Sequence, residues 1–138
     1  MSPRPCIPSW WSSDEWSTPQ PFIDALIARH GPFTLDVCAR AETAKAPRFY
    51  TIADDGLRAL WYGMVWCNPP YSNPRPWIEK AIKSTRVPHH TRVTVLLPAA
   101  TDTGWFHDLV LPYASIELLR GRLKFLGWEG KPIGSPKD

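Results

Sequence analysis

The sequence predicts an α/β fold, a single domain in which a parallel sheet is flanked by helices on both faces. Strand-like and helix-like segments alternate along residues 18–119, as expected where helical crossovers join parallel strands. A short apolar run over residues 64–67 ends abruptly at prolines, which is typical of a buried strand. The chain has 138 residues, enough for one domain with one core.

The domain is expected to span residues 16–138. Residues 1–15 are rich in Pro, Ser and Trp and have no hydrophobic period, so they predict an irregular N-terminal arm. The sequence contains no internal repeat and no convincing domain boundary.

The first predicted helix begins with Thr18 as its N-cap and Pro19 at its first position, and it ends at Gly31. Apolar residues recur along it with helical spacing, and these are Phe22, Ile23, Leu26 and Ile27. Residues 33–37 predict the first core strand. Residues 48–52 are aromatic and β-branched and predict the second.

A second helix is predicted from Asn73-Pro74 onward, and its apolar face is formed by Trp77, Ile78, Ala81 and Ile82. Residues 92–97 form the clearest strand pattern and are ended by Pro98. Thr101-Asp102 is expected to cap a short helix, and residues 115–119 predict a further strand. The glycine-rich and proline-rich tail that follows predicts a basic, aromatic loop.

Composition excludes several classes of protein. Hydrophobic residues make up 43% and charged residues 21% of the chain, as in ordinary globular proteins. No apolar run approaches the length of a bilayer span and no signal peptide is indicated, so no membrane association is expected. Three cysteines at unrelated spacing predict neither a disulfide framework nor a zinc site, and they fit a reducing cytoplasm.

The net charge of +3 permits binding to a polyanion without proving it. Basic residues are densest from Lys80 to Arg92. This region is interpreted either as a solvated helix end and loop or as an edge that contacts phosphates.

The most informative segment is Asn68-Pro69-Pro70-Tyr71. Neither proline has a backbone N–H, so the segment is a stiff loop at the carboxyl end of a strand, where open α/β sheets bind ligands. Asn68 Oδ1 and the Pro69 carbonyl can accept hydrogen bonds from an exocyclic amino group, and Tyr71 can stack on the ring that carries it. A proline-stiffened turn with a packed tyrosine is the alternative interpretation.

At these residues the chain resembles the amino-methyltransferases that use S-adenosylmethionine, and more specifically the phage-type DNA N6-adenine methyltransferase (Dam-like) family. Similar segments follow the family's order through nearly the whole chain. They are Trp16-Ser-Thr-Pro19, Phe33-Thr-Leu-Asp-Val-Cys-Ala39, Asp55-Gly-Leu57 with Trp61, residues 68–72, Leu97-Pro98-Ala99, residues 101–107, and Gly121-Arg122 with Phe125. The resemblance implies the Rossmann-like methyltransferase form of the sheet.

The resemblance also implies site residues. The catalytic ones are Asn68, Pro69, Pro70 and Tyr71. The cofactor-binding ones are Trp16, Ser17, Thr18, Pro19, Asp36, Cys38, Ala39, Asp54, Asp55 and Asn68, and the substrate-binding ones are Tyr71 and Ser72. Apart from the resemblance, Trp77 and Arg122 are further candidates to contact the base or the DNA strand. No metal is expected.

Two acidic residues can each be interpreted in two ways. Asp36 is expected to face the ammonium group of the cofactor's methionine moiety, but it can equally cap a helix or pair with an arginine. Asp55 is a better candidate than Asp54 to accept a hydrogen bond from the cofactor's adenine, but Asp54-Asp55-Gly56 can be an ordinary turn.

The chain departs from the family pattern in two places. There is no large insertion between strands for a separate target-recognition domain. The family continues past a tail like Gly134-Ser-Pro136 into another apolar strand, and this sequence ends at Asp138 without one. We therefore expect that a C-terminal edge strand is missing or that the sequence is cut, which would leave the domain C-terminally incomplete.

The expected function is site-specific transfer of a methyl group from S-adenosylmethionine to the N6 amino group of adenine in double-stranded DNA. It would take place in the cytoplasm, that of the host cell if the protein is phage-encoded. Cytosine N4, RNA adenine or a protein glutamine amide are alternative acceptors. A degenerate, non-catalytic DNA-binding module is the alternative outside enzymes. The sequence specifies neither the recognised DNA sequence nor the oligomeric state.

Overall fold

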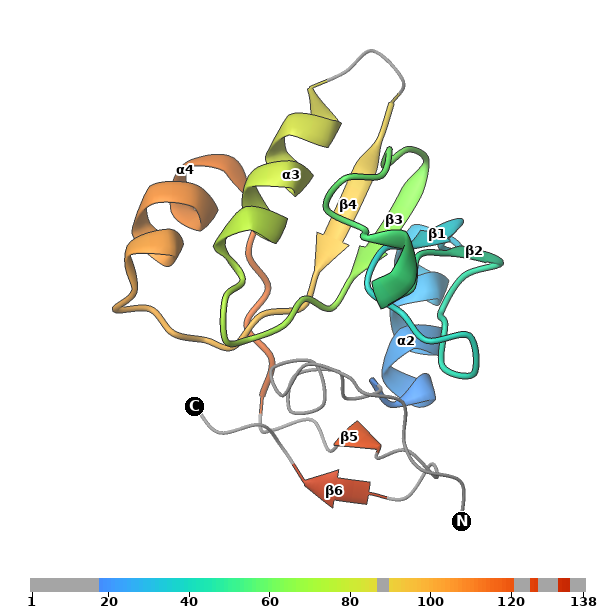
Figure 1. Cartoon of the computed structure of the whole chain (residues 1–138). Coiled ribbons are helices and arrows are strands. Elements are labelled where there is room, and N and C mark those ends of the chain that lie inside the picture. The colour runs from blue at the N-terminus through green and yellow to red at the C-terminus, as the bar shows by residue number, and fades with distance from the viewer. Residues whose placement is uncertain (1–17, 87–89, 121–124, 127–131, 135–138) are drawn as a thin grey trace.

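The computed structural model describes residues 18–86, 90–120, 125–126 and 132–134 (Figure 1). Its centre is a four-stranded parallel sheet in the order β2-β1-β3-β4. The strands are β1 (Leu35–Asp36), β2 (Arg48–Phe49), β3 (Met64–Cys67) and β4 (Arg92–Val95), and the helices are α2 (Gln20–His30), α3 (Arg75–Thr85) and α4 (Leu111–Tyr113). The predicted α/β fold is confirmed.

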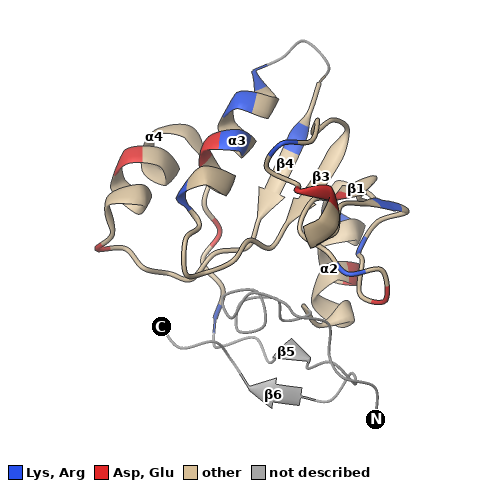
Figure 2. Cartoon of the chain, viewed as in Figure 1, with Lys and Arg blue, Asp and Glu red and all other residues tan. Residues whose placement is uncertain are grey.

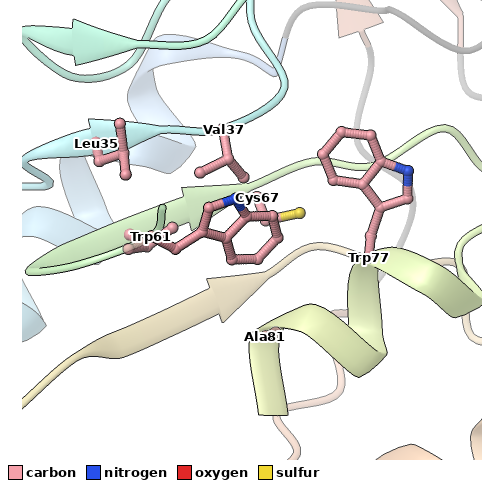
Figure 3. Packing of buried hydrophobic residues seen from close by; sticks show 7 residues of the cluster. Leu35, Val37, Trp61, Cys67, Trp77 and Ala81 are labelled. Carbon is pink, nitrogen blue, oxygen red and sulfur yellow. The ribbon is translucent and has the colours of Figure 1, made fainter. Parts of the chain in front are cut away.

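Helices α2 and α3 cover opposite faces of this sheet (Figure 1). Along β3, Val65 and Cys67 pack with α3, whereas Trp66 packs with α2, because successive strand side chains point to opposite faces. The α3 side holds the larger buried cluster, shown in Figure 3, which consists of Leu35, Val37, Trp61, Val65, Cys67, Trp77 and Ala81. Burial of these side chains is what fixes the helices on the sheet.

Helix α2 has the predicted apolar face and the predicted end. Ile23 and Leu26 are buried against Phe33 and Trp66. Gly31 adopts φ of 93° and its N–H donates to the carbonyl of Ile27, which closes the helix. The predicted N-cap was wrong, because no side chain caps α2 and the Thr18 hydroxyl is bonded elsewhere.

The second strand is shorter than the predicted residues 48–52. It ends at Phe49, although Tyr50 N–H still donates to the carbonyl of Asp36. Thr51 then caps a 3₁₀ turn, η1 (Ile52–Asp54), in which the Asp54 carboxylate accepts from the Thr51 N–H at 2.8 Å. This local capping box competes with the extended backbone and ends the strand.

The predicted strand at residues 115–119 was wrong. Residues 114–119 have no regular secondary structure, and apolar side chains there are exposed, with Leu118 at 74%. A strand needs a pairing partner, and none of the described strands pairs with this segment.

The helix expected after Thr101-Asp102 has a different cap. Residues 101–103 form a turn, and Thr103 Oγ1 accepts from the N–H of Phe106 at 3.3 Å. A π-helical segment, η2 (Phe106–Val110), then leads into α4.

Within the described ranges 18–86 and 90–120, no helix combines the length and apolar character of a bilayer span.

Near the C-terminus the structure contains a short antiparallel pair, β5 (Phe125–Leu126) with β6 (Pro132–Gly134), where the sequence predicted a loop. Several predictions lie outside the described residues. These are the arm at residues 1–15 and the site residues Trp16, Ser17 and Arg122.

Candidate active site

The strand order determines where a ligand can bind. The chain passes from β1 outward to β2 and then returns to β3 on the other side of β1. The carboxyl ends of β1 and β3 therefore flank the point where the winding reverses, which is where open α/β sheets bind ligands. Residues 37–39 and 68–72 follow these two strand ends.

A cavity of about 440 Å³ lies at this edge of the sheet. Its volume is within the range of pockets that bind small molecules and cofactors. Three parts of the chain line it: the turn after β1, the segment after β2, and the loop from β3 into α3. The lining residues are Val37, Cys38, Ala39, Tyr50, Thr51, Ile52, Asp55, Gly56, Leu57, Pro70, Ser72, Asn73, Pro76 and Trp77.

The structure brings together six of the residues that the sequence singled out, since Cys38, Ala39, Asp55, Pro70, Ser72 and Trp77 all line the cavity. Other described candidates are not among the lining residues, namely Thr18, Pro19, Asp36, Asp54, Asn68, Pro69 and Tyr71. Ser72 and Trp77, which were expected to contact the substrate, thus line the same cavity as Cys38, Ala39 and Asp55, which were expected to contact the cofactor.

Asn68 stands at the start of the loop that follows β3. Its side chain is half-buried, and its Nδ2 donates to the hydroxyl of Thr18 at 3.1 Å. Pro69 and Pro70 are both buried. The N–H of Asn73 donates to the carbonyl of Pro70, so a turn follows the prolines and holds the loop in one shape.

Tyr71 is half-buried, and burial raises the pKa of its hydroxyl. The phenol therefore stays neutral at physiological pH. A neutral aromatic ring beside Asn68 is compatible with stacking on a flat, uncharged base.

The two neighbouring aspartates at residues 54 and 55 have different surroundings. Asp54 is occupied by the capping box with Thr51. Asp55 adopts a left-handed backbone with φ of 52° and lines the cavity, with Arg58 Nε at 3.4 Å from its carboxylate. Its position keeps Asp55 as the candidate to bind a ligand and leaves Asp54 with a structural role.

Asp36 is buried and anchors the turn that follows β1. One carboxylate oxygen accepts from the N–H of Cys38 at 3.3 Å, and the other accepts from the N–H of Lys45 at 2.9 Å. Burial raises the pKa of Asp36 to about 6, and these backbone hydrogen bonds oppose part of that rise. Asp36 thus shapes the turn at Cys38 whether or not it also meets a cationic ligand.

The raised pKa of Asp36 predicts how stability depends on pH. The folded protein keeps this proton at a higher pH than the unfolded chain does, so the contribution of Asp36 to stability falls as pH rises through about 6. The free energy of unfolding of wild type minus that of Asp36→Asn should therefore decrease as the pH rises through about 6, since asparagine does not titrate. Urea unfolding at a series of pH values measures this difference, and a difference that increases with pH would contradict the assignment.

Gly56 and Trp77 form a closely packed wall that sequence reasoning did not identify as a unit. Trp61 donates from its indole N–H to the Gly56 carbonyl at 2.8 Å and stacks with Trp77, with ring centroids 6.1 Å apart. A Cβ at Gly56 would overlap the carbonyl oxygen of Val37 and would lie 3.2 Å from the Trp77 ring. The Asp-Gly pair was visible in the sequence only as a turn signal, because this close approach involves residues from three different segments.

Lys80, at the start of the dense basic region, lies with its ammonium group 5.7 Å from the centroid of the Trp61 ring, whereas the rest of the described region lies away from the cavity. Arg92 begins β4 and is paired with Met64 at the start of β3, so it lies at the edge of the sheet opposite Asn68. Lys83 and Arg86 lie at the C-terminal end of α3, whereas Pro76 and Trp77 near its N-terminal end line the cavity. Figure 2 shows basic segments in blue along α3. This placement favours a solvated helix end over a phosphate contact beside the site.

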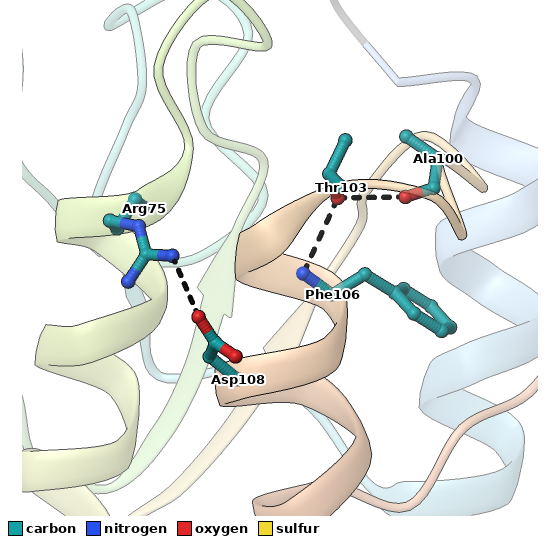
Figure 4. A network of polar contacts seen from close by, with 5 residues as sticks. All are labelled: Arg75, Ala100, Thr103, Phe106 and Asp108. Carbon is teal, nitrogen blue, oxygen red and sulfur yellow. Dashed lines mark hydrogen bonds and ion pairs between the residues drawn. The ribbon is translucent and has the colours of Figure 1, made fainter.

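The segment after β4 is held in place by the contacts drawn in Figure 4. Thr103 Oγ1 donates to the carbonyl of Ala100 at 2.7 Å and accepts from Phe106 N–H. Arg75, at the start of α3, pairs with Asp108 of η2 at 3.5 Å. The helical segment after β4 is thereby tied to the helix that carries Trp77.

No group of metal-ligating side chains occurs among the residues that the structure describes.

A parallel sheet with this strand order, a cavity at its switch point and an Asn-Pro-Pro-Tyr loop beside that cavity together define a Rossmann-like α/β fold of the methyltransferase class. The profile of the family described as DNA N-6-adenine-methyltransferase (Dam) matches residues 10–134. The chain belongs to this family.

Curated relatives agree with this assignment. The chain is 38% identical over 98 residues to a DNA N-6-adenine-methyltransferase of Escherichia phage T1, an alignment that covers 69% of this chain and 40% of that protein. It is 43% identical over 120 residues to a DNA N-6-adenine-methyltransferase of Haemophilus phage HP1, which covers 84% of this chain and 68% of that protein. The chain thus spans less than half of the first relative and about two thirds of the second. No solved structure matches.

Proposed function

We propose that this chain transfers a methyl group from S-adenosylmethionine to the N6 amino group of adenine in double-stranded DNA. The observation that carries the proposal is the rigid Asn-Pro-Pro-Tyr loop, of which Pro70 lines the cavity of about 440 Å³. Membership of the adenine-N6 family favours DNA adenine over the other amino acceptors. The proposed compartment is the cytoplasm, that of the host cell if the protein is phage-encoded.

The cavity has the chemistry that the adenosine part of this cofactor requires. Trp77 and Leu57 form an apolar part of the cavity wall, and the Asp55 carboxylate can accept a hydrogen bond from an amino or hydroxyl group. When bound, S-adenosylmethionine supplies an electrophilic methyl group on a sulfonium. Asp36, buried behind the turn at Cys38, holds that turn in the shape that lines the cavity.

Asn68 and Pro69 would activate the acceptor. The amino nitrogen of adenine is a poor nucleophile because its lone pair is delocalised into the ring. Asn68 Oδ1 and the Pro69 carbonyl each accept a hydrogen bond from one of its two N–H groups, which favours a pyramidal nitrogen with an available lone pair. As positive charge develops on that nitrogen, these oxygen dipoles are already oriented to stabilise it.

Tyr71 would hold the base in this position. An adenine that is paired and stacked cannot reach the loop, so it must rotate out of the duplex. The neutral ring of Tyr71 then offers a stacking surface, whose contribution is typically about 1–3 kcal/mol per base. The loop from β3 to α3 thereby binds the base, and its neighbours line the cofactor cavity.

The test is to incubate the protein with labelled S-adenosylmethionine and unmethylated double-stranded DNA. Digestion to nucleosides should recover the label as N6-methyladenine, and mapping the modified positions should identify the recognised sequence. Single-stranded DNA, RNA and protein should be assayed in parallel. Label in N4-methylcytosine, or only in RNA or protein, would overturn the proposed acceptor, and a folded protein that neither binds the cofactor nor transfers label would overturn the activity.

A further inference from the structure

We propose that Arg75 contacts a backbone phosphate of the DNA, next to the adenine that enters the Asn-Pro-Pro-Tyr loop. The proposal rests on the function proposed above, in which that adenine rotates out of the duplex toward Asn68 and Tyr71. Arg75 was not among the candidate residues that the sequence suggested.

Arg75 is the first residue of α3 and closely follows the Asn-Pro-Pro-Tyr loop. Its helical neighbours Pro76 and Trp77 line the cavity, but Arg75 does not. Its guanidinium extends instead toward η2, where Nη2 lies 3.5 Å from the Asp108 carboxylate (Figure 4). The start of α3 therefore supplies apolar side chains to the cavity and a cation to a different surface.

The strand order places the cavity and this cation on different sides of the loop. The order is β2-β1-β3-β4, and the segments after β1 and β2 line the cavity. Helical segment η2 follows β4, whose carboxyl end adjoins that of β3 because the Leu96 N–H donates to the Cys67 carbonyl at 3.0 Å. The loop after β3 thus lies between the cavity and Arg75. With the cofactor in the cavity, the side that holds Arg75 is open to DNA.

The guanidinium is accessible and has further donors for a phosphate. The Arg75 side chain is 43% exposed, and its one contact with Asp108 uses a single nitrogen. An arginine carries five N–H donors in a planar fork that fits phosphate oxygens. Exposed ion pairs of this kind contribute little to stability, so a phosphate can replace the Asp108 carboxylate at little cost.

An adenine that has rotated out of the duplex stays attached to its strand, so the phosphates that flank it lie close to the loop that holds the base. A cation beside that loop positions the strand without reading its sequence. Each phosphate that a protein cation neutralises releases counterions. Loss of one such contact is therefore measurable as a weaker dependence of DNA binding on salt.

The experiment measures binding of a mixed-sequence DNA duplex by fluorescence anisotropy at a series of salt concentrations, without cofactor. Arg75→Gln should bind roughly ten-fold more weakly at low salt, as expected for loss of a hydrogen bond to a charged group. The slope of log affinity against log salt should become shallower by about 0.9. Arg75→Lys should keep the wild-type slope, because lysine keeps the charge.

Arg86→Gln is the matched control, because it removes the same charge from the other end of α3. Its affinity and salt slope should equal those of wild type. A wild-type slope in Arg75→Gln, or an equal loss in Arg86→Gln, would overturn the proposal.

Asp108→Asn separates a phosphate contact from a purely structural role. If Arg75 acted only by tying α3 to η2, this variant would break the same tie and would weaken DNA binding as Arg75→Gln does. A phosphate contact predicts affinity at least equal to that of wild type, since the variant removes a carboxylate that competes for the guanidinium. A loss of affinity as large as that of Arg75→Gln would overturn the proposal.

Methyl transfer gives a second readout. Arg75→Gln should raise the KM for DNA about ten-fold and leave the rate constant at saturating DNA within about two-fold, because Arg75 does not touch the reacting atoms. A reduced rate constant with an unchanged KM would overturn the proposal. If wild type shows these salt slopes but transfers no label, the proposed function fails and the phosphate contact stands. If wild type methylates adenine while Arg75→Gln keeps the wild-type slope, only the phosphate contact fails.

Discussion

Replacement of Asn68 by alanine should nearly abolish methyl transfer and should leave the affinity for S-adenosylmethionine within a few-fold of the wild-type value. The amide oxygen is one of two acceptors for the reacting amino group, and loss of one preorganised dipole at such a site typically costs about 100- to 1000-fold in rate. Asn68 is not among the residues that line the cavity, so the cofactor should be bound much as before. Single-turnover kinetics and calorimetry measure the two quantities separately.

Asn68→Asp is the matched control for this prediction. The carboxylate keeps an acceptor oxygen at the same position, so this variant should retain far more activity than the alanine variant. Circular dichroism should confirm that both variants fold, because each changes the contact with Thr18. Turnover by Asn68→Ala close to that of wild type would show that Asn68 has no part in activating the acceptor.

Gly56→Ala should weaken cofactor binding at least about ten-fold and lower the free energy of unfolding by about 1–3 kcal/mol, the usual cost of overpacking. The new methyl group would overlap the carbonyl of Val37 and would lie 3.2 Å and 3.3 Å from two atoms of the Trp77 ring. Relief requires that the backbone or the Trp77 indole shift, and both form the wall of the cavity. Urea unfolding and calorimetry with S-adenosylmethionine measure the two effects.

Gly104→Ala is the matched control, because the same substitution meets different surroundings there. A Cβ at Gly104 would come no closer than 3.4 Å to the end of the flexible Arg75 side chain. Alanine is also favoured over glycine within a helix. This variant should retain wild-type stability and binding, and a Gly56→Ala protein that behaved in the same way would refute the packing argument.

Much of the fold follows from local signals in the sequence. The apolar periods of α2 and α3, the glycine after α2 and the prolines after β3 were all read correctly, because each depends on residues within one segment. The predicted strand at residues 115–119 failed for the opposite reason. Its composition favours a strand, but pairing depends on a neighbour that the composition does not specify.

The candidate site also has features that the sequence predicts locally and features that depend on the tertiary structure. The turn at Cys38, Asp55 and the loop from Asn68 each follow a strand, and the parallel pairing of β1 with β2 and β3 brings these three segments to one edge of the sheet. Sequence reasoning expected Trp77 to contact the substrate, and the structure shows that Trp77 lines the cavity. The side chain reaches the cavity because α3 packs on the face of the sheet that carries Val37 and Cys67.

The sequence by itself determined the alternation of strands and helices and the stiff Asn-Pro-Pro-Tyr loop, because hydrophobic period and proline chemistry act over a few residues. Only the tertiary structure decided that Thr18 bonds to Asn68 and that Gly56 lies against Val37 and Trp77. These contacts join distant segments, and their geometry depends on how whole helices pack on the sheet. No local pattern in the chain carries that information.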